Sequence, residues 1–210
     1  MYIDRDIDKL MVRTQNRPLV TGALTPRAAM IFAIALEIVA FCVLWAGANL
    51  LAAILAVTAT LFYVFVYSLW LKRTSKQNIV IGGAAGAMPV LVGWAAVTNS
   101  LGWAPVILFV VIFLWTPPHF WALAIRHADD YKAAGVPMMP VVVSLERTVR
   151  SMTIYAVLLT ISTLVLIPIS DLGWIYGVTA LVFGVAFVIG AARLGVDPSE
   201  KRSMRLFTFS

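Results

Sequence analysis

Long apolar stretches separated by short polar segments dominate the chain. A helix needs about 20 apolar residues to cross the roughly 30 Å hydrocarbon core of a bilayer. Six stretches approach or exceed that length, at roughly 28–47, 50–70, 79–98, 103–124, 153–170 and 174–194. The pattern predicts an all-α polytopic membrane protein with six transmembrane helices. Because no linker or change of composition interrupts it, we expect a single domain over residues 1–210.

The segments between the predicted helices alternate in charge. Three short connections carry no Lys or Arg, and all 16 basic residues lie in the other four segments. Basic residues accumulate on the cytoplasmic side of membrane proteins. We therefore expect these four segments in the cytoplasm, with the protein in a bacterial plasma membrane. The alternative is the matrix side of a mitochondrial inner membrane.

The composition excludes a soluble domain. Hydrophobic residues make up 61% and charged residues 12% of the chain, against about 45–50% and about 25% in soluble domains. The lone Cys42 excludes an intrachain disulfide and a Cys-rich metal site. We expect the lipid bilayer as a partner, and no nucleic acid.

Two aspartates near the start of the chain form the first candidate site. On a helix, Asp4 and Asp8 lie one turn apart on the same face, and their mutual repulsion favours a cation between them. Mg²⁺ binds few protein carboxylates and fills its other positions with water and substrate phosphates. The pair is thus suited to a metal–diphosphate, or else it is a solvated face beside the membrane. Asp6 points elsewhere and is expected to be a solvated charge.

A second acidic segment follows the fourth predicted helix on the same side of the membrane. If its carboxylates, Asp129 and Asp130, faced Asp4 and Asp8, the two segments would hold two metals or both ends of one diphosphate. The alternative is an ordinary helix end with mixed charges. The Gly- and Pro-containing segment 135–140 predicts a constrained loop after it.

Several basic residues on this side are candidate donors to phosphate oxygens. Phosphate groups favour both point charges and bidentate guanidinium donors. The candidates are Arg13, Arg17, Lys72, Arg73, Arg126 and Lys132. Topology alone is the alternative explanation for basic residues at helix ends.

Three further residues within the predicted helices are candidates for a functional role. His119 is an ionisable group at membrane depth, where it could bind haem iron, transfer a proton or bond a neighbouring helix. Trp115 precedes it by about one helical turn. Tyr67 lies on a polar stripe with Thr60 and Tyr63, and its alternative role is an interfacial anchor.

Small residues mark one face of the third predicted helix. Gly82 and Gly86 form a small-xxx-small surface that allows close helix contact. The same surface leaves room for an apolar chain. Glu37 is a further ionisable group within the membrane, without an obvious partner in its own helix.

Six motifs occur in order along essentially the whole chain. They are Asp4–Asp8, Arg13–Gly22, Asn78–Pro89, Trp115–Trp121, Arg126–Tyr131 and Gly135–Pro140. Taken together, they resemble the haem O synthase (protoheme IX farnesyltransferase) family of the UbiA superfamily of intramembrane prenyltransferases. Trp115–Trp121 and the Asp-Asp-Tyr…Pro-Met-Met-Pro loop are the segments that are similar to the haem branch.

The resemblance implies a nine-helix bundle with a central cavity, of which this chain would supply six helices. It also implies an Asn-xxx-Asp-xxx-Asp motif that includes Asp4 and Asp8, with its asparagine immediately before Met1. We therefore expect an internal fragment of a longer chain.

The resemblance further implies a Mg²⁺-dependent transfer of the farnesyl group of farnesyl diphosphate to a vinyl group of haem b, which gives haem O. Asp4, Asp8, Asp129 and Asp130 would hold the metal. The basic candidates would bind the diphosphate, and His119, Trp115 and Tyr67 would lie on the haem side. The alternatives are an aromatic acceptor such as 4-hydroxybenzoate, and a non-catalytic transporter or scaffold. An oxidase-assembly partner is expected only by analogy.

Overall fold

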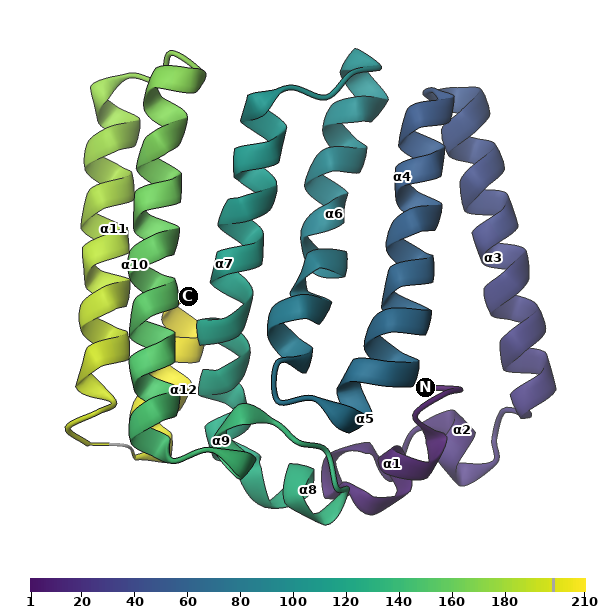
Figure 1. Cartoon of the computed structure of the whole chain (residues 1–210). Helices are drawn as coiled ribbons and strands as arrows, with labels where there is room; N and C mark the ends of the chain where they lie inside the picture. The colour runs from purple at the N-terminus through teal and green to yellow at the C-terminus, as the bar shows by residue number, and fades with distance from the viewer. Residues whose placement is uncertain (198) are drawn as a thin grey trace.

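A computed structural model of the chain describes residues 1–197 and 199–210 (Figure 1). Six helices in these ranges are long and apolar enough to cross a bilayer, as predicted. They are α3 (Pro26–Gly47), the continuous span of α4 (Leu50–Leu61), η2 (Phe62–Leu71) and α5 (Lys72–Thr74), then α6 (Asn78–Thr98), α7 (Trp103–Arg126), α10 (Leu145–Ile169) and α11 (Trp174–Arg193). Five of the six lie close to the predicted ranges.

The fifth span is longer than predicted, because α10 begins at Leu145 rather than near residue 153. The side chain of Ser144 caps the helix by accepting a hydrogen bond from the backbone N–H of Arg147 at 3.4 Å. Glu146 lies in the first turn, where a negative charge is favourable. These first turns are polar, so hydropathy marks only the apolar remainder of the helix.

The second span changes its winding before it ends. The segment η2 is a π-helix, whose i→i+5 hydrogen bonds give a wider turn than the α-helix. Tyr63 and Tyr67 follow one face of it, with ring centroids 5.4 Å apart. The hydropathy pattern contains no signal for this change.

Neighbouring spans pack in chain order, with α3 on α4, α4 on α6, α6 on α7, α7 on α10 and α10 on α11. In Figure 1 they stand side by side, with the short connections at the upper edge and the longer segments at the lower edge. Large apolar side chains such as Phe32, Ile34 and Phe183 are exposed on the outer surfaces. An apolar surface of this extent is stable in lipid rather than in water, so the chain is an integral membrane protein.

Short helices form the lower edge of the molecule. They are α1 (Arg5–Leu10), the 3₁₀ turn η1 (Val12–Thr14), α2 (Pro18–Thr21), α8 (Ala128–Ala133) and α9 (Met139–Val142). A further helix, α12 (Glu200–Phe209), packs against α7 and α11. The largely apolar segment 206–209 therefore lies in a helix.

A small apolar cluster joins the segments at this edge. It contains buried residues of α1, of the loop after α8, of α6 and of α7, namely Ile7, Met11, Ile79, Ala124, Val136 and Met138. Burial of each large apolar side chain stabilises such a contact by about 1.5–3 kcal/mol. The cluster therefore holds the two acidic segments next to each other.

The two glycines of the predicted close-contact surface differ in their surroundings. A Cβ on Gly82 would overlap the ring of Tyr67, so close approach at Gly82 is confirmed. No atom lies within 4 Å of a Cβ placed on Gly86. The helix therefore contacts η2 at one position and leaves open space one turn later.

Candidate active site

The first acidic motif lies on α1 with two of its three carboxylates buried. Asp4 is 5% and Asp8 3% exposed, whereas the side chain of Asp6 is 63% exposed. This difference follows from helical spacing, because positions four apart share a face. Buried carboxylates require ionic or hydrogen-bonding partners.

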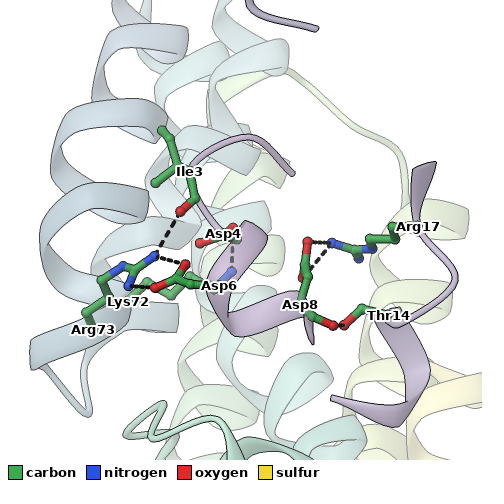
Figure 2. A network of polar contacts seen from close by, with 8 residues as sticks. All are labelled: Ile3, Asp4, Asp6, Asp8, Thr14, Arg17, Lys72 and Arg73. Atoms are coloured by element: carbon green, nitrogen blue, oxygen red, sulfur yellow. Dashed lines mark hydrogen bonds and ion pairs between the residues drawn. The ribbon is translucent and has the colours of Figure 1, made fainter. Parts of the chain in front are cut away.

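Each buried carboxylate has a cationic partner from another segment (Figure 2). Lys72 Nζ at the end of η2 lies 2.7 Å from Asp4 Oδ2. Arg17 Nη1 donates to both oxygens of Asp8, at 2.9 and 2.8 Å. Two of the predicted phosphate donors therefore neutralise the two carboxylates predicted to hold a metal.

Asp6 is paired with Arg73, which corrects the expectation of a solvated charge. Arg73 donates from Nη1 to Asp6 Oδ2 at 2.7 Å and from Nη2 to Asp6 Oδ1 at 2.8 Å. Its Nη2 also donates to the backbone oxygen of Ile3 at 2.8 Å. This hydrogen bonding by Arg73 lowers the pKa of the Asp6 carboxyl. Figure 2 shows the result, in which Arg73 ties the start of α1 to the end of the second span.

The second acidic segment reaches the first through Asp130. The backbone N–H of Val12 donates to Asp130 Oδ1 at 3.3 Å, and His127 Nδ1 lies 4.0 Å from Asp130 Oδ2. Asp129 is exposed. The segments are therefore adjacent, although no group of three His, Cys, Asp or Glu side chains able to hold a metal occurs within residues 1–197 and 199–210.

Arg13 influences the titration of this second segment. Burial lowers the pKa of His127, and the nearby charge of Arg13 lowers it further. Burial raises the pKa of Tyr131, and the charge of Arg13 opposes that change. Arg13 therefore lies beside α8, where its charge acts on His127 and Tyr131.

One observation indicates that the carboxylates of α1 are suited to bind a divalent cation. Asp4 Oδ1 is buried and has no hydrogen-bond partner among the described residues. An unpaired carboxylate oxygen is a hard ligand of the kind that Mg²⁺ favours. Asp8 follows one turn later and is similarly buried.

An apolar cavity of about 510 Å³ lies above α1, between the second span, α6 and α7. Thr60, Tyr63 and Tyr67 line it, as do Gly86 and Trp115. Tyr67 also packs against the apolar cluster to which α1 contributes Ile7, and Ile79 belongs both to that cluster and to the cavity wall. The cavity therefore adjoins the cluster that holds α1.

The acceptor candidates on α7 lie in different surroundings. Trp115 lines the cavity and stacks on His119 with centroids 4.1 Å apart. His119 in turn stacks on Phe207 of α12 at 4.4 Å, and its Nδ1 lies 2.7 Å from Ser210 Oγ. The structure thus brings Trp115 and Tyr67 to one cavity and places His119 against α12.

The predicted phosphate donors lie at different places in the structure. Arg17, Lys72 and Arg73 pair with α1, and Arg13 lies close to α8. Arg126 instead lines a second cavity with residues of α12. Lys132 is exposed on α8.

The sequence analysis missed three features of the site. Thr14 is buried and donates to the backbone oxygen of Asp8 at 2.7 Å, a contact that depends on the turn at η1. Asn78 is fully buried with no hydrogen-bond partner for its side chain among the described residues. In the sequence, the only indication of this feature was that Asn78 is a polar residue at the start of an apolar stretch. Glu37 accepts a hydrogen bond from Thr60 at 3.2 Å, which a single helix could not reveal.

Comparison with known proteins identifies this arrangement. The UbiA prenyltransferase family matches residues 1–210. The chain belongs to this family. It is 54% identical to the protoheme IX farnesyltransferase of Gloeobacter violaceus over 97% of the chain and 67% of that relative. It is 51% identical to the protein of that name from Parafrankia sp., over 100% of the chain and 68% of the relative.

The UbiA-type fold is also supported by a solved structure. That structure, described as concerning digeranylgeranylglyceryl phosphate synthase in membranes, superposes with a TM-score of 0.77 over 99% of this chain and 72% of its own. The sequence identity is 21%, so the likeness establishes the fold alone. The chain spans about two thirds of the length of the curated relatives that it matches.

Proposed function

We propose that this UbiA-family protein transfers the farnesyl group of farnesyl diphosphate to a vinyl group of haem b, which gives haem O. Identity of about half along nearly the whole chain to relatives named protoheme IX farnesyltransferase carries the proposal. The buried carboxylates beside an apolar cavity are consistent with a charged diphosphate attached to an apolar chain. We assign the activity to the full-length protein.

Asp4 and Asp8 would hold Mg²⁺, with Asp130, and less directly Asp129, on the other side. When bound, the metal would stabilise negative charge on the leaving diphosphate. Lys72 and Arg17 are positioned to donate to phosphate oxygens once their carboxylates bind the metal. Arg13 and Lys132 are further candidate donors.

Arg73 has a different role from Lys72 in this arrangement. Its guanidinium makes three hydrogen bonds, two to Asp6 and one to the Ile3 carbonyl. It therefore positions α1, whereas Lys72 makes a single contact to one oxygen of Asp4. Of these two residues, we therefore propose only Lys72 as a donor to the diphosphate.

The apolar cavity would hold the farnesyl chain and the reacting carbons. The C1–O bond of farnesyl diphosphate breaks, and the bonding electrons leave with the diphosphate. The faces of Tyr63, Tyr67 and Trp115 can stabilise the resulting allylic cation. The haem vinyl group attacks C1, water captures the new cation, and a proton is released.

The same proposal includes the orientation in the membrane. All the candidate donors lie at one edge of the molecule, and the relatives named above are bacterial. We propose the bacterial plasma membrane with this edge in the cytoplasm. A mitochondrial inner membrane with the edge in the matrix is the alternative.

The deciding experiment supplies haem b and farnesyl diphosphate to membranes that contain the full-length protein, with Mg²⁺ or with a chelator. Mass spectrometry should show a hydroxyethylfarnesyl group gained by haem only when the metal is present. A parallel reaction with 4-hydroxybenzoate tests the aromatic acceptor. Farnesylation of 4-hydroxybenzoate but not of haem would overturn the assignment of the acceptor.

A matched pair of variants tests the carboxylates. Asp8→Ala should lower the rate of haem farnesylation by roughly a hundredfold or more, because loss of one electrostatic group at a developing charge has effects of that size. Asp197→Ala removes an exposed carboxylate that pairs with Arg202 and should leave the rate unchanged. Equal rates for Asp8→Ala and the unmodified protein would contradict the role of this motif.

A further inference from the structure

We propose that a second cavity, between α7 and α12, binds the two propionate carboxylates of the haem acceptor. This inference rests on the proposed function, and it names residues outside the motif on α1. The cavity measures about 720 Å³ and is lined by Arg126, Glu200, Lys201, Met204, Arg205, Thr208 and Phe209. The sequence analysis predicted that Arg126 binds the diphosphate, and this proposal assigns it to the haem acceptor instead.

Three cations of this cavity differ from Lys72, Arg73 and Arg17 in having no carboxylate partner within the described residues. Lys72, Arg73 and Arg17 each pair with an aspartate. By contrast, Arg126, Lys201 and Arg205 form no ion pair with any carboxylate in residues 1–197 and 199–210. Three positive side chains therefore remain available to an anionic ligand around one cavity.

The charge and the polarity of the lining suit an amphipathic dicarboxylate. With Glu200, the three cations leave a net charge of +2, which matches two propionates. The cations come from two helices, so they can contact two separate carboxylates. Met204 and Phe209 provide an apolar wall for the porphyrin ring. Carboxylates at a membrane surface need such partners.

The position of this cavity is consistent with the direction in which haem must point. The vinyl groups of haem b lie on the edge of the macrocycle opposite the propionates. Phe209 also lines a cavity of about 270 Å³ that includes Trp115, and Trp115 lines the central cavity as well. Haem held by its propionates between α7 and α12 can thus direct its vinyl edge toward Trp115 and the farnesyl chain.

A lipid phosphate is the other anion that this cavity could bind. A phospholipid headgroup presents a single phosphate, and its acyl chains lie along the outer surface. The spaced cations and the series of cavities leading inward favour the dicarboxylate. The experiment therefore separates carboxylate recognition from general anion binding.

The test measures haem binding directly. Full-length protein in detergent is titrated with haem b and with haem b dimethyl ester, and binding is followed by the Soret absorbance. The variants are Arg126→Gln and Arg205→Gln, and the matched control is Arg202→Gln, because Arg202 lies on the same helix but pairs with Asp197. Melting temperatures verify that each variant is folded.

We expect each cavity variant to weaken haem b binding by about tenfold, the effect of losing one charge-assisted hydrogen bond at a partly exposed site. Arg202→Gln should bind haem b as the unmodified protein does. The dimethyl ester should bind the unmodified protein weakly, and the cavity variants should not weaken it further. The KM for farnesyl diphosphate should not change.

Three results would overturn the inference. Equal losses with haem b and its ester would mean that the cations act on the fold or on lipid. A raised KM for farnesyl diphosphate would return Arg126 to the diphosphate site. Unchanged haem b binding in both cavity variants, in a protein that still makes haem O, would refute the propionate site alone. Absence of haem O from the unmodified protein would refute the proposed function instead.

Discussion

The site at α1 contains buried charges, and the partner of Asp4 lies far away in the sequence. Asp4 and Lys72 are 68 positions apart and meet at 2.7 Å. Burial of two charges is favourable only when they pair well, and removal of one partner leaves the other charge uncompensated. Each pair therefore holds α1 in place and keeps a basic side chain beside a carboxylate that is proposed to bind the metal.

Removal of the Lys72 charge tests whether the buried Asp4 depends on this ionic partner. Lys72→Met should destabilise the protein by about 3 kcal/mol, because Asp4 would lose its ionic partner while it stays buried. The double variant Asp4→Asn/Lys72→Met should recover most of that stability but no activity. Denaturant unfolding in detergent, with haem farnesylation measured in parallel, gives both values. Full stability in the single variant would show that the pair does not hold α1.

Asn78 presents the opposite case, a buried amide without a partner in the described chain. An unsatisfied buried polar group costs about 1–3 kcal/mol. Asn78→Leu should therefore raise the melting temperature of the protein without substrate. If the substrate uses the amide, the same variant should raise the KM for farnesyl diphosphate. A lower melting temperature would indicate that the amide is satisfied in the folded protein.

At the scale of elements, α6 and η2 form one wall of the central cavity. The ring of Tyr67 packs directly on Gly82, whereas the backbone at Gly86 faces open space. The π-helical turn brings Tyr63 and Tyr67 to the same wall. The width of the cavity therefore depends on small residues on one helix and on the winding of the other.

Two alanine substitutions compare the packed position Gly82 of α6 with the open position Gly86. Gly82→Ala should destabilise the bundle by about 1–3 kcal/mol, because the ring of Tyr67 must move to accept the methyl group. Gly86→Ala meets no atom within 4 Å and should stabilise the protein by about 0.5–1 kcal/mol, because alanine favours the helical backbone more than glycine does. Thermal unfolding of both variants in one detergent makes the comparison. Equal effects would contradict the packing at Gly82.

At the scale of the whole molecule, the chain is a row of helices with the short helices and the longer connecting segments at one edge (Figure 1). Every basic residue lies in the four segments at that edge or at the helix ends beside it. The metal, the diphosphate and the propionates are therefore all proposed to bind at the same membrane surface. Only the farnesyl chain and the porphyrin ring would enter the hydrocarbon region.

Accessibility of single cysteines tests this orientation. In a Cys42→Ser background, Lys76→Cys should react with a membrane-impermeant maleimide only from the cytoplasmic side. Ser100→Cys, in a short connection at the opposite edge, should react only from the outside. Both positions are exposed. Labelling of both from one side would exclude the proposed topology.

The six spans and the segments that carry the acidic motifs were predictable from the sequence, whereas the sidedness of the segments stays a prediction. Hydropathy and charge act locally, since each helix must satisfy its own backbone and cover the bilayer. Helical spacing likewise predicted that Asp4 and Asp8 share a face, and their burial agrees. The early start of α10 was missed because polar helical turns outside the bilayer carry no hydropathy signal.

Only the tertiary structure decided which groups meet. Lys72 contacts Asp4, Arg73 contacts Asp6, and Arg126 turns toward α12 rather than α1. These choices depend on the π-helical register of η2 and on packing between helices that are distant in sequence. A basic residue at a helix end is equally compatible with several partners. The sequence by itself therefore determined the kinds of groups at the membrane surface, and the packing of the helices determined their pairing.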